Sequence, residues 1–243
     1  MIMNDTRDAD IDIPVPWFLL THPQGNVVID GGNAAECISD PVAYWGEVAR
    51  DFWPDMQPED DCVRALDSVG VDAESVRYVL HSHLHTDHTG AIGRFPNATH
   101  IVQRAEYSYG LEPDWFAEDE YLLRELTMEG VSWQFLNAGE DDFLDLFGDE
   151  SLVIIHTPGH SPGHQSFLVK LRNNGHILLA LDAAYTMVQW EQKALPGILT
   201  SAVEVAQSLR KLRRIADRHE AMVVPGHDAD QWATFRLAPG YYD

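Results

Sequence analysis

One stretch of this sequence, residues 81–90, reads His-Ser-His-Leu-His-Thr-Asp-His-Thr-Gly. It holds four histidines and one aspartate within eight consecutive positions, a density of metal-binding side chains that no ordinary structural role explains. Neutral imidazole suits Zn²⁺, Fe²⁺ and Co²⁺, and a carboxylate adds anionic charge for a second ion. One metal ion normally takes three or four protein ligands, so this stretch predicts a site with more than one ion. The candidate ligands are His83, His85, Asp87 and His88.

These four side chains can face a common point only if the backbone turns sharply just past the end of a strand. The preceding residues, 76–80, are β-branched and apolar, which is typical of a buried strand. Periodicity and turn signals predict further strands over 15–20, 26–30, 100–103, 132–136, 151–156, 165–171, 176–181 and 221–224. Helices are predicted over 58–68, 114–128 and 202–219.

Three later segments each place a donor at the predicted end of a strand. His160 lies in a loop rich in proline and glycine, Asp182 ends the apolar run 178–181, and His227 follows a Pro-Gly turn. A single histidine at such a place is more often structural than functional. Together with the first cluster, the order His, Asp, His becomes a composite pattern that indicates one site.

Composition narrows the class of substrate. The formal net charge is −23, from 39 acidic and 16 basic residues, and such a surface repels phosphate backbones and anionic lipid. A small neutral or cationic molecule is easier to accommodate than nucleic acid or a membrane. No apolar run approaches a membrane span, and residues 1–6 lack the features of a secretory signal, so we expect a cytoplasmic protein. Cys37 and Cys62 are expected to be free thiols.

The motifs together resemble those of the metallo-β-lactamase superfamily over nearly the whole length. That resemblance implies an α/β fold, a four-layer αββα sandwich, in a single hydrolase domain over 1–243. It also implies two divalent ions, for which Zn²⁺ is the default and Fe²⁺, Co²⁺ and Mn²⁺ remain open. By motif position, the first metal is held by His83, His85 and His160, the second by Asp87, His88 and His227, and both by the bridging Asp182.

Within the superfamily, Asp182-Ala183-Ala184-Tyr185 resembles the Asp-x-x-Tyr of the N-acyl-homoserine lactone lactonases, the quorum-quenching enzymes. Residues 157–166 and 101–107 share the same likeness. A true β-lactamase typically has cysteine or serine in place of Asp182. The resemblance implies that a metal-bridging hydroxide opens the lactone ring. Tyr185 would donate a hydrogen bond to the developing oxyanion, and Asp87 would pass a proton to the leaving oxygen.

Several alternatives stay open. Another lactonase, of the pyridoxolactonase or butyrolactonase type, and a thioesterase of the glyoxalase II type would share most ligands. Glyoxalase II carries a helical C-terminal domain for which this chain leaves no room after His227. A phosphodiesterase is disfavoured by the charge, and a binding-only metal module by the full ligand set. The family also tends to form homodimers. It usually has a longer segment before the stretch corresponding to residues 13–20, so a first edge strand and part of the substrate pocket are expected to be either missing or differently built.

Overall fold

The computed structural model describes residues 10–137, 139, 142–192 and 194–243. Its chain divides into two compact units. The first unit spans Val15–Leu136, and the second comprises Asn137–Asp243 together with the residues up to Pro14. Residues 1–9, where the sequence shows no secretory signal, lie outside the described residues. The single domain predicted for residues 1–243 stays a prediction.

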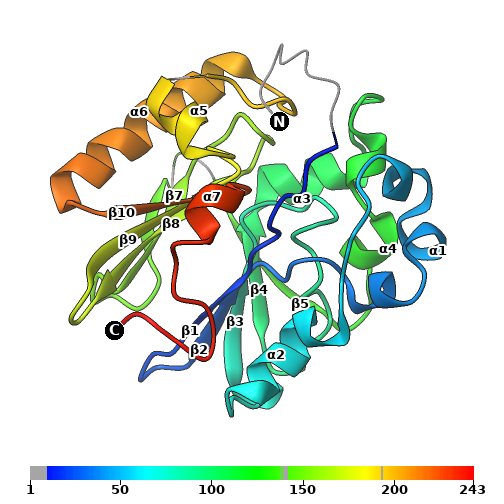
Figure 1. Cartoon of the computed structure of the whole chain (residues 1–243), viewed down its shortest axis with the longest axis horizontal. Helices are drawn as coiled ribbons and strands as arrows, with labels where there is room; N and C mark the ends of the chain where they lie inside the picture. The colour runs from blue at the N-terminus through cyan, green and yellow to red at the C-terminus, as the bar shows by residue number, and fades with distance from the viewer. Residues whose placement is uncertain (1–9, 138, 140–141, 193) are drawn as a thin grey trace. The chain divides into compact units, whose positions relative to one another are not determined.

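The first unit is built on a five-stranded sheet whose strands lie in chain order (Figure 1). Only the edge pair is antiparallel, and the remaining pairs are parallel. Apolar side chains of the inner strands, such as Val28 and Val79, are completely buried against helix α2 and its neighbours. The strands are β1 (Phe18–Leu20), β2 (Asn26–Ile29), β3 (Val76–Leu80), β4 (Thr99–Gln103) and β5 (Ser132–Leu136). The predicted strands are therefore confirmed, with shorter first and second members.

Short helices lie between β2 and β3 and between β4 and β5. The α-helices are α1 (Pro41–Trp45), α2 (Cys62–Ser68), α3 (Arg104–Leu111) and α4 (Leu123–Leu126). The 3₁₀ helices are η1 (Ala35–Ile38), η2 (Gly46–Arg50), η3 (Pro58–Asp60), η4 (Ala73–Ser75) and η5 (Glu118–Glu120). Both cysteines are free and buried, as expected, and burial raises the pKa of each thiol to about 12.

The continuous helix predicted over 58–68 is wrong. It is divided at Asp61, whose backbone is extended (φ −59°, ψ 126°). The Asp61 carboxylate accepts a hydrogen bond from the Arg64 amide at 3.0 Å and so caps the N-terminus of α2. A salt bridge of 3.0 Å to Arg94 holds the same carboxylate, which is 2% exposed, inside the unit.

The helix predicted over 114–128 is also wrong. The segment instead forms η5 and the short α4, separated by extended residues. The Glu120 carbonyl accepts from the Thr86 amide at 3.0 Å, whereas a continuous helix would have directed it to residue 124. The Tyr121 hydroxyl donates to the buried Glu106 carboxylate at 3.1 Å. Long-range contacts to the histidine-rich loop therefore override the local helical preference.

The second unit contains another five-stranded sheet, in the order β10-β9-β8-β7-β6. Its antiparallel strands are β6 (Phe143–Asp145), β7 (Leu152–His156), β8 (Gln165–Leu171) and β9 (Gly175–Leu181), and β10 (Met222–Pro225) runs parallel to β9. Helices α5 (Met187–Gln192), α6 (Ala202–His219) and α7 (Ala229–Trp232) complete it. The sequence analysis found all of these strands except β6, and of these helices only α6.

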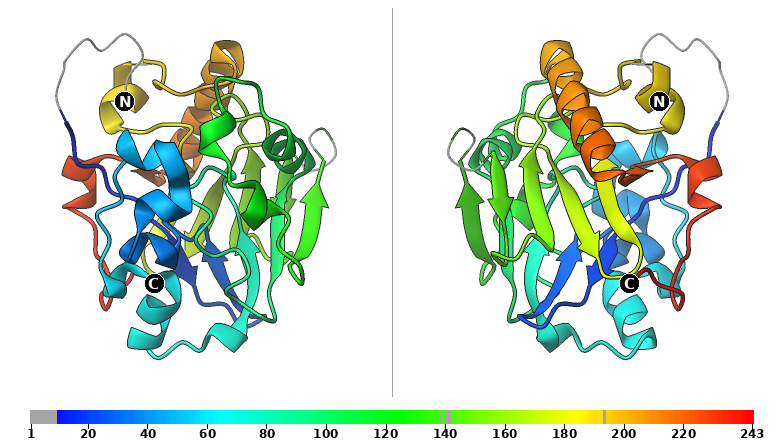
Figure 2. Two further views of the ribbon diagram at one scale, coloured as in Figure 1. Left: turned by 90° about the vertical axis from the view of Figure 1, so that its right-hand side faces the viewer. Right: turned by 90° about the vertical axis from the view of Figure 1, so that its left-hand side faces the viewer.

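Helix α6 packs along the sheet of its own unit (Figure 2). Val205, Leu209 and Leu212 form its buried stripe, and they share one core cluster with Leu168 and Leu178 of the sheet. Their spacing places them on one face of the helix. Among the described residues, no helix combines the length and the apolar character that crossing a membrane requires.

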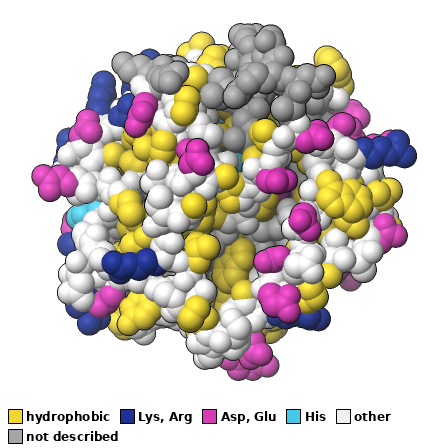
Figure 3. Space-filling model, in the orientation of Figure 1, with side chains coloured by type: hydrophobic (Ala, Val, Ile, Leu, Met, Phe, Trp, Pro, Cys, Tyr) yellow, Lys and Arg dark blue, Asp and Glu magenta, His cyan; other side chains and the backbone are white. Residues whose placement is uncertain are grey.

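Acidic side chains lie over much of the face shown in Figure 3, interspersed with lysines and arginines. This distribution agrees with a formal net charge of −23. It fits the simplest interpretation of that charge, a solvated surface, rather than one anionic recognition patch.

The N-terminus of α6 is hydrogen-bonded to the loop that follows β7. Ser201 caps the helix through a 3.3 Å hydrogen bond from the Glu204 amide to its hydroxyl. The Gly159 carbonyl accepts from the amides of Thr200 and Ser201, both at 2.9 Å. A Cβ atom at Gly159 would lie 2.3 Å from the Val205 amide nitrogen, so only glycine allows this close approach.

We expect Gly159→Ala to lower the free energy of unfolding by about 3 kcal/mol, because it adds a steric clash to an unfavourable positive φ. The matched control is Gly175→Ala, since Gly175 also has positive φ but nothing within 4 Å of the added Cβ. That control should cost about 1 kcal/mol. Urea denaturation of both variants measures the difference, and equal losses would contradict the packing argument.

Candidate metal centre

The histidine-rich loop of the first unit follows directly after β3. His83 and His88 are completely buried and His85 is 6% exposed. The ring centroid of His83 lies 4.5 Å from that of His85 and 4.1 Å from that of His88. Three imidazoles packed so closely in a protein interior cannot all carry a proton charge at low cost. Such packing suits neutral rings that act as metal ligands.

Asp30 fixes this loop from the end of β2, and the sequence analysis gave it no role. Its carboxylate accepts from the Ser82 amide and the Ser82 hydroxyl, both at 2.7 Å, and from His88 Nδ1 at 3.0 Å. Burial raises the pKa of Asp30, and the contacts to His88 and Ser82 oppose that shift. A signal was present, because Asp30 ends a buried strand as Asp182 does.

The following pair, Gly31-Gly32, allows the chain to pass close to the histidine-rich loop. The Gly31 amide donates to the His88 carbonyl, and the Gly90 amide donates to the Gly32 carbonyl, both at 2.9 Å. A Cβ atom at Gly31 would lie 1.9 Å from the amide nitrogen of Ala91. The glycine pair therefore serves the geometry of the loop.

Hydrogen bonds decide which nitrogen of each ring carries the proton. Ser82 donates its only hydroxyl hydrogen to Asp30, so its oxygen must accept from His83 Nδ1, which lies 2.9 Å away. His88 Nδ1 donates to Asp30 in the same way. In the neutral rings of His83 and His88 the lone pair is thus on Nε2, the nitrogen a metal would use.

His85 has the opposite arrangement. Its Nε2 lies 3.0 Å from Oε2 of Glu120, so in the neutral ring Nδ1 is the lone-pair nitrogen. Burial lowers the pKa of His85, but the hydrogen bond and the charge of Glu120 outweigh it, and the net shift is upward. Asp87, whose side chain is 26% exposed, directs Oδ2 toward His88 Nε2 at 3.6 Å.

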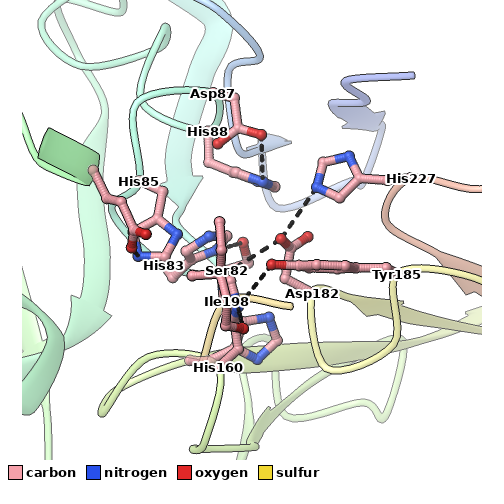
Figure 4. A network of polar contacts seen from close by, with 12 residues as sticks. Ser82, His83, His85, Asp87, His88, His160, Asp182, Tyr185, Ile198 and His227 are labelled. Carbon is pink, nitrogen blue, oxygen red and sulfur yellow. Dashed lines mark hydrogen bonds and ion pairs between the residues drawn. The ribbon is translucent and has the colours of Figure 1, made fainter. Parts of the chain in front are cut away.

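The second unit carries its own cluster, shown in Figure 4 around the carboxylate of Asp182. Asp182 directly follows β9 and is 3% exposed. Its Oδ2 lies 3.1 Å from His227 Nε2 and 3.5 Å from His160 Nε2. His227 follows β10 after Gly226, and His160 lies in the loop after β7. Each of the three donors therefore sits past the end of its strand, as predicted.

The other nitrogen of each ring in this cluster faces a backbone carbonyl. His160 Nδ1 lies 3.1 Å from the carbonyl of Ile198, and His227 Nδ1 lies 2.8 Å from that of Pro14. A carbonyl oxygen only accepts, so both Nδ1 atoms carry hydrogen. In the neutral rings the Nε2 lone pairs therefore face the Asp182 carboxylate. A positive charge between them is needed to offset this repulsion, either a proton on each ring or a shared cation. A divalent cation satisfies both rings and the carboxylate, so this donor set fits a metal ion.

Tyr185 completes the second cluster. Its hydroxyl oxygen lies 3.2 Å from His160 Nδ1, and the side chain is buried. Because His160 Nδ1 is already the donor toward Ile198, the tyrosine oxygen accepts in this contact. The contact therefore fixes the position of the phenol without using its hydrogen.

Other histidines near the motifs have structural partners. His81 Nε2 lies 2.9 Å from His100 Nδ1 in a buried stack against Trp133, and burial lowers the pKa of His81 far below its usual value. His81 therefore has a packing role at the end of β3. His164 Nδ1 lies 2.9 Å from the Thr157 hydroxyl, and the His164 carbonyl accepts from the Thr157 amide. It braces the loop that carries His160.

Each unit thus brings its own predicted donors together, four in the first unit and three in the second. All seven are among the described side chains whose ligand atoms could hold a metal ion: His83, His85, Asp87, His88, His160, Asp182 and His227.

A model described as the metallo-beta-lactamase superfamily matches residues 11–227. The chain belongs to this superfamily. The match spans every donor described above, from the histidine-rich loop to His227, and confirms the predicted family.

Curated relatives in the superfamily are similar along almost the whole chain. The N-acyl homoserine lactonase AttM of Azorhizobium caulinodans is 54% identical over 241 residues, which cover 99% of this chain and 92% of that protein. The N-acyl homoserine lactonase AiiA of Bacillus thuringiensis subsp. kurstaki is 30% identical over 95% of this chain and 88% of that protein.

A solved structure supports the fold. It shows an N-acyl homoserine lactone hydrolase with the product N-hexanoyl-L-homoserine bound at its catalytic metal centre. The similarity has a TM-score of 0.84 at 26% identity, and covers 100% of this chain and 92% of that one. The predicted metallo-β-lactamase fold is therefore confirmed.

We expect Asp30→Ala to lower the free energy of unfolding of the metal-free protein by about 3 kcal/mol, because three buried donors on Ser82 and His88 lose their acceptor. Glu150→Ala is the control, since Glu150 is also an acid at positive φ (63°) but its side chain is 81% exposed. It should change stability by less than about 0.5 kcal/mol. Similar urea midpoints for the two variants would show that Asp30 does not hold the loop.

Proposed function

We propose that this protein is a metal-dependent hydrolase that opens the lactone ring of N-acyl-homoserine lactones, a quorum-quenching activity. The observation that carries the proposal is the 54% identity to an N-acyl homoserine lactonase over 99% of the chain. The buried donor sets described above supply the chemistry such a reaction needs. Tyr185 lies in the Asp-x-x-Tyr element three residues after Asp182, in contact with a candidate ligand.

We further propose that the seven candidate donors belong to one dinuclear centre and that residues 1–243 form a single domain. Asp182 would bridge two ions, the first also held by His83, His85 and His160 and the second by Asp87, His88 and His227. The family match over 11–227, which contains all seven residues, supports this assignment. Their ligand atoms are nitrogen and oxygen without a thiolate, so Zn²⁺ is the default, while Fe²⁺, Co²⁺ and Mn²⁺ suit the same set.

When bound, such ions supply hydroxide at neutral pH and polarise the substrate carbonyl. The chain's own residues then carry the remaining steps. The Tyr185 hydroxyl, held in place by its contact with His160, donates a hydrogen bond to the oxygen of the lactone carbonyl as negative charge develops there. This interaction strengthens in the transition state, because the oxyanion is a better acceptor than the neutral carbonyl.

Asp87 is the candidate carrier of the proton. Its side chain is 26% exposed, whereas Asp182 is 3% exposed, so Asp87 is the candidate carboxylate that solvent reaches. One of its oxygens would accept the nucleophile's proton and return it to the ring oxygen as the C–O bond breaks. The product is an open-chain hydroxy acid, N-acyl-homoserine.

Two other features stay predictions from the sequence, namely a cytoplasmic location and a homodimeric state. The relatives above favour a homoserine lactone over a pyridoxolactone or a thioester as substrate. The surface charge of −23 still disfavours nucleic acid and anionic membranes as partners.

Metal removal tests the proposal directly. We expect the metal-loaded protein to bind two ions per chain and to open N-hexanoyl-homoserine lactone, followed in a pH-stat. Chelation should abolish turnover, and zinc should restore it. Turnover that survives chelation would refute the metal-dependent mechanism. A simple thioester cleaved far faster than any lactone would assign a thioesterase, and cleavage of bis(p-nitrophenyl) phosphate alone would assign a phosphodiesterase.

Removing one hydroxyl tests the oxyanion role. We expect Tyr185→Phe to lower kcat for the lactone about 100-fold with little change in KM, because the lost hydrogen bond acts mainly in the transition state. Tyr241→Phe is the control, since Tyr241 is 75% exposed and should leave both constants unchanged. A Tyr185→Phe variant with the original kcat would show that Tyr185 is only a packing residue.

A further inference from the structure

Glu120 contacts the histidine-rich loop from η5, although it belongs to none of the motifs in the sequence. Its Oε2 lies 3.0 Å from Nε2 of His85, and both side chains are largely buried, at 19% and 8% exposed. Its backbone carbonyl separately accepts from the Thr86 amide at 3.0 Å. The residue therefore contacts the loop twice, once through the main chain and once through the carboxylate.

The contact between Glu120 and His85 determines which nitrogen of the His85 ring carries the hydrogen. His83, His88, His160 and His227 each use Nδ1 toward an oxygen acceptor of the protein, which leaves Nε2 as the lone-pair nitrogen. In His85 it is instead Nε2 that faces an acceptor, the carboxylate of Glu120. An imidazole free of that acceptor would exchange its proton between the two nitrogens, and only one form presents Nδ1 for coordination.

Neighbouring residues hold His85 and Glu120 in position for this contact. The Tyr121 ring packs edge-on against the His85 ring with centroids 4.9 Å apart. The Tyr121 hydroxyl and the Leu84 amide both donate to Oε1 of the buried Glu106, at 3.1 and 3.0 Å. Leu84 and Thr86 on either side of His85, and Tyr121 next to Glu120, are thus held by groups that a change of the Glu120 side chain leaves in place.

We propose that Glu120 is a positioning residue of the metal centre, which holds His85 with its hydrogen on Nε2 so that Nδ1 is the ligand atom. This inference rests on the proposed function, because it takes His85 as a ligand. Beyond selecting the tautomer, the carboxylate makes the ring a stronger electron donor, as hydrogen-bonded acidic partners of metal-binding histidines do.

The first readout uses metal-free protein labelled with ¹⁵N at histidine. Long-range ¹H–¹⁵N spectra near pH 8 report the tautomer of each ring. In the wild type we expect His85 as the Nε2–H form. Glu120→Ala should give a mixture of both forms, whereas Glu120→Gln should keep the Nε2–H form because its amide oxygen still accepts the hydrogen bond.

The second readout is zinc affinity, measured by competition with a chelating indicator. Glu120→Ala should weaken zinc binding 10- to 100-fold, and Glu120→Gln by a smaller factor, because it keeps the acceptor but loses the charge. Glu118→Ala and Glu118→Gln are matched controls, since Glu118 is an exposed acid on the same 3₁₀ helix. Both controls should keep the wild-type tautomer and affinity.

The inference is overturned if Glu120→Ala retains both the pure Nε2–H tautomer and the wild-type affinity. It is also overturned if the Glu118 variants lose as much affinity, since that would be a general charge effect. Should Glu120→Ala fail to fold, Glu120→Gln decides the question through its affinity relative to Glu118→Gln. A wild-type protein that binds no zinc would refute the proposed metal centre, while the tautomer comparison would still decide whether Glu120 orients His85.

Discussion

The candidate centre depends on hydrogen bonds made on the far side of each imidazole. Asp30 holds His88 directly and His83 through Ser82, and main-chain carbonyls hold His160 and His227. Each acceptor fixes one ring hydrogen, and therefore fixes which nitrogen faces a cation. Without such partners the rings could rotate and exchange protons, and the geometry needed for a metal ion would be populated only part of the time.

Two carboxylates of the candidate centre lie directly after the end of a strand. Asp30 follows β2 and Asp182 follows β9. A positive φ occurs at each of these strand ends, at Asp30 itself (57°) and at Leu181, the residue before Asp182 (50°). A positive φ turns the chain abruptly, so a carboxylate can point away from the sheet immediately after the last paired residue. Local strain of this kind persists because the buried strand before it is firmly held.

The sequence could place the candidate donors at strand ends because their signal is local. Histidines and aspartates after apolar runs, with proline or glycine beside them, mark strand ends without knowledge of the tertiary structure. Asp30 and Glu120 were missed, because each acquires its role from a partner that is distant in the chain, such as Ser82, which is 52 residues from Asp30. The helix expected over 114–128 failed for the same reason, since its carbonyl at Glu120 is used by Thr86.

The hydrogen bond from His227 to Pro14 spans 213 residues of sequence. During synthesis, Pro14 is added 213 residues before His227, so its carbonyl can orient the imidazole only after that whole stretch has been made. The histidine-rich loop, in contrast, has Asp30 available as soon as the first unit emerges. The hydrogen-bond partners of His83 and His88 are therefore all synthesised long before His227 can meet its own acceptor.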